Sequence, residues 1–147
     1  MVEKTGVVYA LGEAVRYAHS FTENALGVIF IGSRTREDGS AHERSDVDLL
    51  SLVKQVGPGV LHLHGCVEDR LKALGLEQDW AGTLRADFVS DLFYGKADEF
   101  SRQSLEIVKK VVNRYSVIIT PDHFLRFQLN SILKPQEREY PGRVLAA

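Results

Sequence analysis

The spacing of apolar residues along this chain changes from segment to segment and predicts several amphipathic helices. Apolar side chains recur every three or four residues over 7–21, 60–74, 100–115 and 121–133. This is the period at which side chains return to one face of a helix. Each of these segments is therefore expected to pack one apolar face against the rest of the domain.

Four other segments show the patterns of strands. Residues 26–31 and 46–53 are short, nearly continuous apolar runs rich in branched side chains, and 84–93 and 116–120 are shorter or alternating. Continuous runs are typical of strands that are buried on both faces. With the helices, they predict an α/β (α+β) fold, in which a small mixed sheet has helices packed on one face.

Two of the predicted helices carry start signals. Thr5 can cap the first helix, which we expect to end near Thr22, and Thr120-Pro121 places a capping residue before a proline that favours the first turn. The last helix is apolar over much of its circumference, so we expect it to cover a sheet edge or bind a partner. We accordingly divide the chain into a domain over 1–120 and a helix and tail over 121–147, which could also serve as a homo-oligomer contact over 121–133.

Composition fits one domain and gives no sign of a nucleic-acid partner. The chain has 147 residues, 44% of them hydrophobic, and 18 basic residues nearly balance 20 acidic ones. A chain of this length can bury about two thirds of the surface that it exposes when unfolded. Because no run of Lys or Arg stands out, bulk charge does not indicate nucleic-acid binding.

The sequence favours the cytoplasm. Cys66 is the one cysteine, so no internal disulfide can form, and the first residues lack the basic and apolar parts of a signal peptide. No apolar stretch approaches the roughly 20 residues that cross a bilayer. We therefore expect a cytoplasmic protein without a membrane partner.

The candidate chemistry lies where the first two predicted strands meet. The first is followed by Gly32 and Ser33, and the second begins with Asp46 and Asp48. Residues two apart on a strand point to the same face, about 6.5 to 7 Å apart at their Cα atoms, so both carboxylates can converge on one cation. Oxygen ligands favour Mg²⁺ or Mn²⁺.

The turn between those strands suits a phosphate. A glycine allows close approach of a backbone, and Ser33 offers a hydroxyl and an amide as donors. Arg34 is a further phosphate candidate, although a loop arginine is commonly just solvated. Asp87, in the predicted strand 84–93, could complete a group of three carboxylates and accept a proton from an attacking hydroxyl.

These residues resemble the polymerase-β-type nucleotidyltransferase superfamily, and most closely its minimal nucleotidyltransferases, often encoded as antitoxins beside HEPN-domain toxins. The shared pattern is Gly-Ser, a loop, Asp46-Val47-Asp48 and a later acidic residue. The resemblance implies metal binding and catalysis by Asp46, Asp48 and Asp87, and nucleotide binding by Gly32, Ser33, Arg34 and Ser45. It implies transfer of a nucleoside monophosphate from a Mg²⁺-bound NTP, with ATP as the expected donor.

The acceptor stays open at the level of sequence. A hydroxyl on a partner protein, such as a tyrosine of a HEPN-type toxin, is the first expectation, and an antibiotic or another small molecule is the second. A non-catalytic module that only binds a partner is the competing class. The loop between the motifs is heavily charged and includes Glu37 and Asp38, which is unfavourable beside a polyanion.

Overall fold

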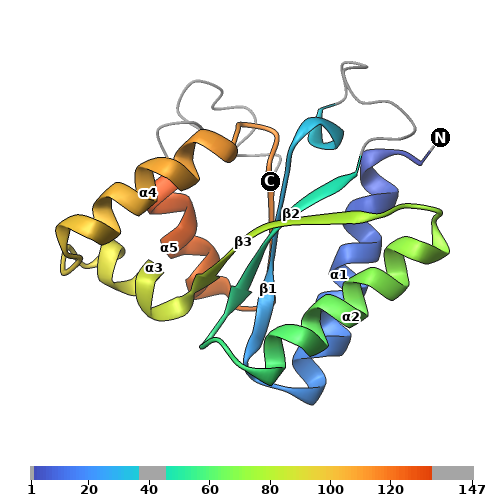
Figure 1. Cartoon of the computed structure of the whole chain (residues 1–147), viewed down its shortest axis with the longest axis horizontal. Helices are drawn as coiled ribbons and strands as arrows, with labels where there is room; N and C mark the ends of the chain where they lie inside the picture. Colours follow the sequence, from blue (N-terminus) through green and yellow to red (C-terminus); the bar gives the residue numbers. More distant parts are fainter. Residues whose placement is uncertain (1, 37–45, 134–147) are drawn as a thin grey trace.

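A four-stranded mixed sheet with helices on both faces makes up the part of the chain that the computed structural model describes, residues 2–36 and 46–133 (Figure 1). The elements in chain order are α1 (Lys4–Phe21), β1 (Ala25–Ile31), the 3-10 helix η1 (Ser33–Thr35), β2 (Val47–Val53), α2 (Pro58–Ala73), β3 (Gln78–Arg85), α3 (Ala86–Phe93), α4 (Glu99–Val111), β4 (Val117–Ile119) and α5 (His123–Leu133).

The sheet has the order β3-β2-β1-β4. β1 pairs antiparallel with both β2 and β4, whereas β2 and β3 are parallel. Parallel neighbours need a crossover connection, and α2 supplies it. Every residue of β1 is buried, which explains why its sequence is one continuous apolar run.

One face of the sheet packs against α1 and α2. We call this apolar cluster the first core; it includes Val7, Leu11, Val15 and Ala18 of α1, Val28 and Phe30 of β1, Leu49 and Val53 of β2, and Leu63, Val67 and Leu71 of α2. The helical spacing of these positions in the sequence places them on the buried faces of their helices.

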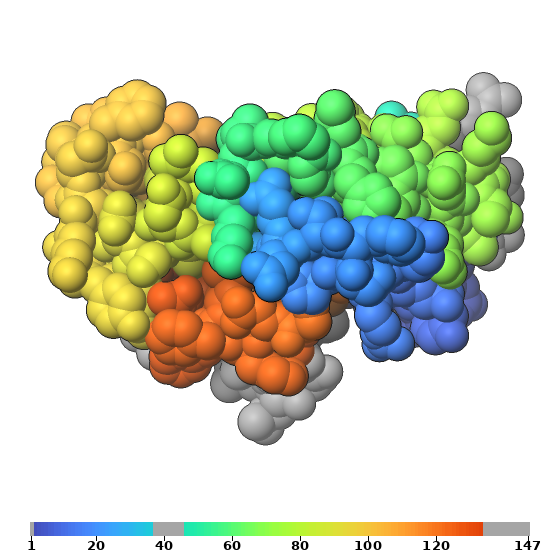
Figure 2. All heavy atoms as spheres, turned by 90° about the horizontal axis from the view of Figure 1, so that it is seen from below, coloured from blue at the N-terminus to red at the C-terminus, as the bar shows by residue number. Residues whose placement is uncertain are grey.

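The opposite face of the sheet is also covered. The second core includes Ile29 and Ile31 of β1, Leu50 and Leu52 of β2, Val89 of α3, and Leu125, Leu129 and Leu133 of α5. Figure 2 shows α5 (orange-red) between α3 and α4 (yellow) and α1 (blue). The predicted α+β class with a mixed sheet is confirmed, but its helices lie on both faces and not on one.

The third strand lies earlier in the chain than its sequence pattern predicts. The pattern favours a strand over 84–93, but β3 ends at Arg85 and the next eight residues form α3. Phe88, Val89, Leu92 and Phe93 recur at helical spacing, which outweighs the short alternation that begins at Leu84. β3 itself contains few apolar residues because it is an edge strand with one exposed face.

Two helix starts also differ from the predicted caps. Glu3 precedes α1 and makes no side-chain cap, while Thr5 lies inside the helix. At α5, Asp122 accepts a hydrogen bond from the Leu125 amide at 2.9 Å, and the Thr120 hydroxyl donates to the Leu26 carbonyl at 2.7 Å. Thr120 therefore fixes the chain to β1 instead of capping the helix.

No helix in the described ranges is both long and apolar enough to cross a membrane.

His64 of α2 stacks on Trp80 of β3 beneath the parallel strand pair. Their ring centroids are 3.8 Å apart at an interplanar angle of 13°, and His64 Nε2 lies 2.7 Å from the hydroxyl of the buried Ser51. Burial lowers the pKa of His64, and the charge of Glu68 opposes this only in part. The neutral imidazole is therefore the form that this packing favours.

The lowered pKa of His64 predicts how stability changes with pH. Because the unfolded chain binds a proton more readily than the folded one, this contribution is present above the ordinary value of 6.5 and is lost as pH falls through the folded pKa. Urea unfolding from about pH 8 to about pH 5 should show a flatter profile for His64→Gln than for wild type. His123→Gln, on an exposed residue of α5, is the matched control. Parallel wild-type and His64→Gln profiles would contradict this assignment.

Candidate functional site

The Gly-Ser turn lies directly after β1, as the sequence predicts. Gly32 precedes η1, and its carbonyl accepts hydrogen bonds from the Thr35 amide at 3.1 Å and the Thr35 hydroxyl at 2.5 Å. Thr35 is fully buried. The buried Thr35 side chain therefore holds the turn through its hydrogen bond to Gly32, whereas Ser33 is exposed.

Gly32 packs directly against the carboxylate of Asp48. The register pairs Ile31 with Asp48, and a Cβ atom on Gly32 would overlap Asp48 Oδ2. The backbone of Gly32 has φ 86° and ψ −172°, a region that is essentially restricted to glycine. The turn and the carboxylate thus form one close-packed unit.

Gly32→Ala should destabilise the protein by about 1–3 kcal/mol through backbone strain, before any cost of displacing the Asp48 carboxylate is added. Gly12→Ala is the matched control, because Gly12 lies inside α1 and an added Cβ would meet no atom within 4 Å. The control should stabilise the helix by about 0.5–1 kcal/mol. Urea unfolding measures both, and equal effects would contradict the close packing described above.

Three acidic residues lie at the end of the sheet that carries this turn. Asp46 immediately precedes β2, Asp48 lies two residues further on, and Asp79 of β3 is in register with Asp48. Burial raises the pKa of Asp48, and the charges of Asp79 and then Asp46 raise it further. Asp48 thus lies where an additional positive charge would be most favourable.

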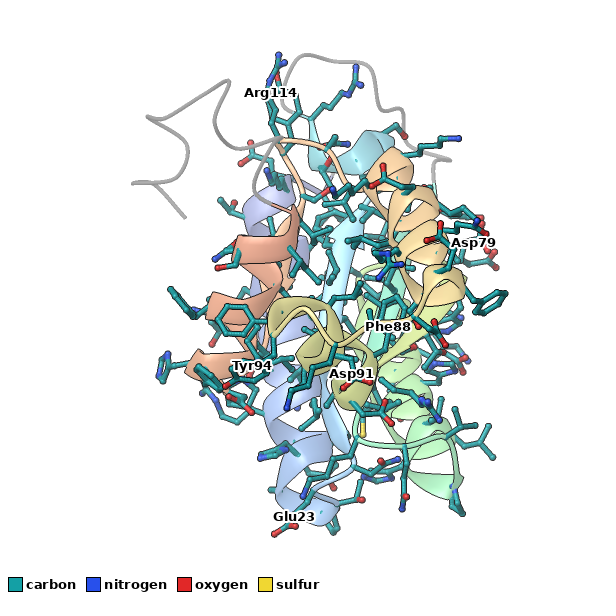
Figure 3. All side chains as sticks on the ribbon, turned by 90° about the vertical axis from the view of Figure 1, so that its left-hand side faces the viewer. Glu23, Asp79, Phe88, Asp91, Tyr94 and Arg114 are labelled. Carbon is teal, nitrogen blue, oxygen red and sulfur yellow. The ribbon has the colours of Figure 1, made fainter. Side chains whose placement is uncertain are left out.

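Asp87 is not part of this group. It lies in the first turn of α3, where it accepts a hydrogen bond from the Phe88 amide at 2.7 Å and contacts Arg85 Nε at 3.2 Å. Arg85 pairs with Val53, five residues along β2 from Asp48, which corresponds to about 16 Å of strand. In Figure 3, Asp79 lies in the upper half of the view and Asp91 of α3 in the lower half. The prediction of Asp87 as the third carboxylate is therefore wrong for this fold.

Asp79 is the acidic residue that the sequence motifs do not reveal, although connectivity points to it. When two parallel strands are joined by a crossover helix, both strands begin at the same end of the sheet. Asp48 is near the start of β2, and Asp79 follows the end of α2 closely. An acidic residue at the start of the third strand is therefore a better candidate than one beyond its end.

The other two residues predicted to bind the nucleotide, Arg34 and Ser45, differ in where they lie. Arg34 is 5% exposed within η1, so it is a buried side chain and not a solvated loop arginine. Ser45 lies outside the described residues, as do Glu37 and Asp38 of the charged loop. The structure therefore brings together Gly32 and Ser33 with the carboxylates, and it buries Arg34 within η1.

The donor atoms at this sheet end suit a hard divalent cation. In residues 2–36 and 46–133, no three His, Cys, Asp or Glu side chains already form a group that could hold a metal ion. The available donors are nevertheless carboxylate oxygens from two adjacent strands, and the raised pKa of Asp48 shows that its surroundings disfavour its charged form. A divalent cation would remove that repulsion, and such oxygen donors suit Mg²⁺.

No protein-family model matches this sequence, and no curated protein is significantly similar to it. The function is therefore inferred from the chemistry of the site.

Proposed function

We propose that this protein is a metal-dependent nucleotidyltransferase. The observation that carries the proposal is the contact between Gly32 and Asp48, which sets the backbone donors of the turn against a carboxylate whose charged form the fold disfavours. Donors of that kind hold phosphate oxygens, and carboxylates of that kind hold a cation that neutralises phosphate charge. The resemblance of the sequence pattern to minimal nucleotidyltransferases supports the same function.

Each group has a separate task in this proposal. Asp46, Asp48 and Asp79 would hold Mg²⁺ or Mn²⁺, which when bound stabilises negative charge on the transferred phosphate and on the leaving group. The Ser33 amide and hydroxyl bind phosphate oxygens and orient the NTP. An acceptor hydroxyl attacks the α-phosphorus, the bond to the pyrophosphate oxygen breaks, and the hydroxyl proton passes to the carboxylate of Asp79.

ATP is the proposed donor, and a hydroxyl of a partner protein is the proposed acceptor. A HEPN-type toxin is the partner that the resemblance suggests, which would make this chain an antitoxin of the cytoplasm. A small molecule such as an antibiotic is the alternative acceptor for the same chemistry.

Thermal unfolding with Mg²⁺ and each NTP tests the proposal most directly. We expect metal and nucleotide together to raise Tm. The free energy of unfolding should increase by about 2.7 kcal/mol when the ligand is at 100 times its Kd. Asp46→Asn should abolish this shift, whereas Asp91→Asn, on an exposed residue of α3, should leave it intact. Absence of a shift with every nucleotide would refute a catalytic role.

A partner-binding module without catalysis is the second candidate, and an exposed aromatic group favours it. Phe93 of α3 lies 6.1 Å from Phe124 and 5.7 Å from Phe127 of α5 by ring centroids. Phe124 and Phe127 are 53% and 57% exposed, although the other face of α5 packs into the second core. Exposed aromatic clusters are typical of protein interfaces, including those between two copies of one chain. Retention of a partner without any metal or nucleotide response would favour this candidate.

A further inference from the structure

Four aromatic side chains of α3, its C-terminal end and α5 form one contiguous group at the surface. The ring of Phe93 lies 5.0 Å from that of Tyr94, and it also contacts the rings of Phe124 and Phe127. Tyr94, at 56%, is as exposed as the two rings of α5. Figure 3 shows Tyr94 on the side of α3 toward α5, whereas Asp91 lies farther from α5. We call these four residues the aromatic face.

The aromatic face is held by a helix that is already fixed to the domain. On the other side of α5, Leu125, Leu129 and Leu133 are buried in the second core. The rings of the aromatic face also restrict one another through their mutual contacts. A partner that docks here therefore orders few additional groups, which keeps the entropic cost of binding low.

The orientations of the rings suit packing against an identical surface. Phe124 and Phe127 are nearly parallel, at 16°, whereas Phe93 is inclined at 80° to the first and 70° to the second. Aromatic rings prefer edge-to-face or offset contacts, in which the edge of one ring meets the face of another. Because the aromatic face contains rings in both orientations, a second copy of it can continue the same edge-to-face packing.

The charges beside the aromatic face are complementary under two-fold symmetry. α3 carries Asp91 and the Arg85-paired Asp87 and has no basic residue, whereas α5 carries His123 and Arg126 and has no acidic residue. A two-fold axis between the two helices places α3 of each copy over α5 of the other, so every contact forms twice. Charges at the rim of such an interface favour this orientation.

The size of the aromatic face fits the centre of a modest interface. An aromatic side chain buries about 150–250 Å², so three rings that are half exposed offer about 300 Å². A standard interface buries about 800 Å² on each partner around an apolar centre, and the polar surfaces of α3 and α5 beside the rings would supply the rest. The net charge of −2 leaves little repulsion between two copies.

We propose that the aromatic face binds the aromatic face of a second copy of this chain, with α3 of each copy over α5 of the other in a two-fold symmetric dimer. This inference does not depend on nucleotidyl transfer. Tyr94 lies in the lower half of Figure 3 and Asp79 in the upper half, so the contact and the candidate site are separate parts of the molecule.

Sedimentation equilibrium of the full chain over a wide concentration series, without metal or nucleotide, tests the dimer. Phe124→Ser and Phe127→Ser should each weaken dimerisation by at least roughly tenfold, because each substitution removes two rings from a two-fold interface. Phe100→Ser is the matched control, since Phe100 is an aromatic residue of α4 that is 77% exposed. His123→Glu should also weaken the dimer, because it brings an acidic residue against α3 of the other copy.

Unfolding temperature verifies that each variant folds. Tyr94→Ser, which follows the last residue of α3, tests the same face if a substitution in α5 unfolds the protein. Monomers at every concentration of wild type would overturn the inference, whether residues 134–147 or a different protein then cover the rings. A dimer that Phe124→Ser, Phe127→Ser and Tyr94→Ser leave as tight as Phe100→Ser does would also overturn it, and an unchanged dimer with His123→Glu would rule out the placement of α3 over α5.

The same measurements separate this inference from the proposed function. Asp48→Asn should dimerise like wild type, because Asp48 lies outside the aromatic face. If the chain dimerises through these rings but turns over no NTP, the dimer stands and nucleotidyl transfer fails. If NTP is turned over by a chain that stays monomeric at every concentration, the function stands and the dimer is refuted.

Discussion

Asp48→Asn is expected to lower the proposed nucleotidyl transfer by about 100- to 1,000-fold, the usual effect of removing one group that stabilises transition-state charge. The same substitution should raise the Tm of the metal-free protein. Burial and the charges of Asp79 and Asp46 raise the pKa of Asp48, so the ionised carboxylate costs stability that a neutral amide of similar shape does not. Transfer assays and thermal unfolding with and without Mg²⁺ measure both effects.

The pH dependence of this gain has a defined sign. A raised folded pKa means that the native state holds the Asp48 proton more tightly, so wild-type stability falls as pH rises from the ordinary value of 3.8 through the raised one. The advantage of Asp48→Asn should therefore grow across that window and stay constant above it. Asp91→Asn, which keeps the site intact, should show no such gain. A metal-free Asp48→Asn protein less stable than wild type would contradict the assignment of Asp48.

Asp79→Asn and Asp87→Asn are expected to separate the two candidates for the third carboxylate. Asp79→Asn should reduce transfer by about 100-fold, because Asp79 is in register with Asp48 and is the proposed proton acceptor. Asp87→Asn removes one exposed ion pair to Arg85, which contributes at most about 1 kcal/mol to stability. Its transfer rate should stay within about threefold of wild type.

These two chemically identical substitutions are to be assayed at the same concentrations of metal and NTP. Metal affinity gives a second readout, because Asp79→Asn should require more Mg²⁺ for half-maximal stabilisation and Asp87→Asn should not. A severe loss with Asp87→Asn and normal activity with Asp79→Asn would restore Asp87 as the third carboxylate.

The centre of the sheet can be predicted from sequence because its signals are local. β1 and β2 are buried along nearly their whole length, so their residues are almost all apolar, and the lengths of the apolar runs indicate the limits of both strands. Gly32 marks a turn because a glycine between an apolar run and a polar loop has few other roles. These local features are enough to place Asp46 and Asp48 beside the turn.

The edge of the sheet cannot be predicted in the same way. β3 has one exposed face and therefore only a weak apolar pattern, while α3 contains enough alternation to resemble a strand. The contacts of Lys4 and Arg36 with the ring of Tyr115 carry no sequence signal, because these residues are far apart in the chain and meet only in the folded sheet and its helices. Such contacts depend on tertiary register, which periodicity does not encode.

The crossover through α2 has a consequence for how the protein folds. Asp48 and Asp79 become neighbours only after α2 has docked on the sheet, since the whole helix separates their strands in the chain. We therefore expect the repulsion between them to arise late in folding, because closing this long connection first costs chain entropy. Divalent ions in the refolding buffer should then slow unfolding more than they speed folding, because the proposed cation site is assembled on the native side of the barrier.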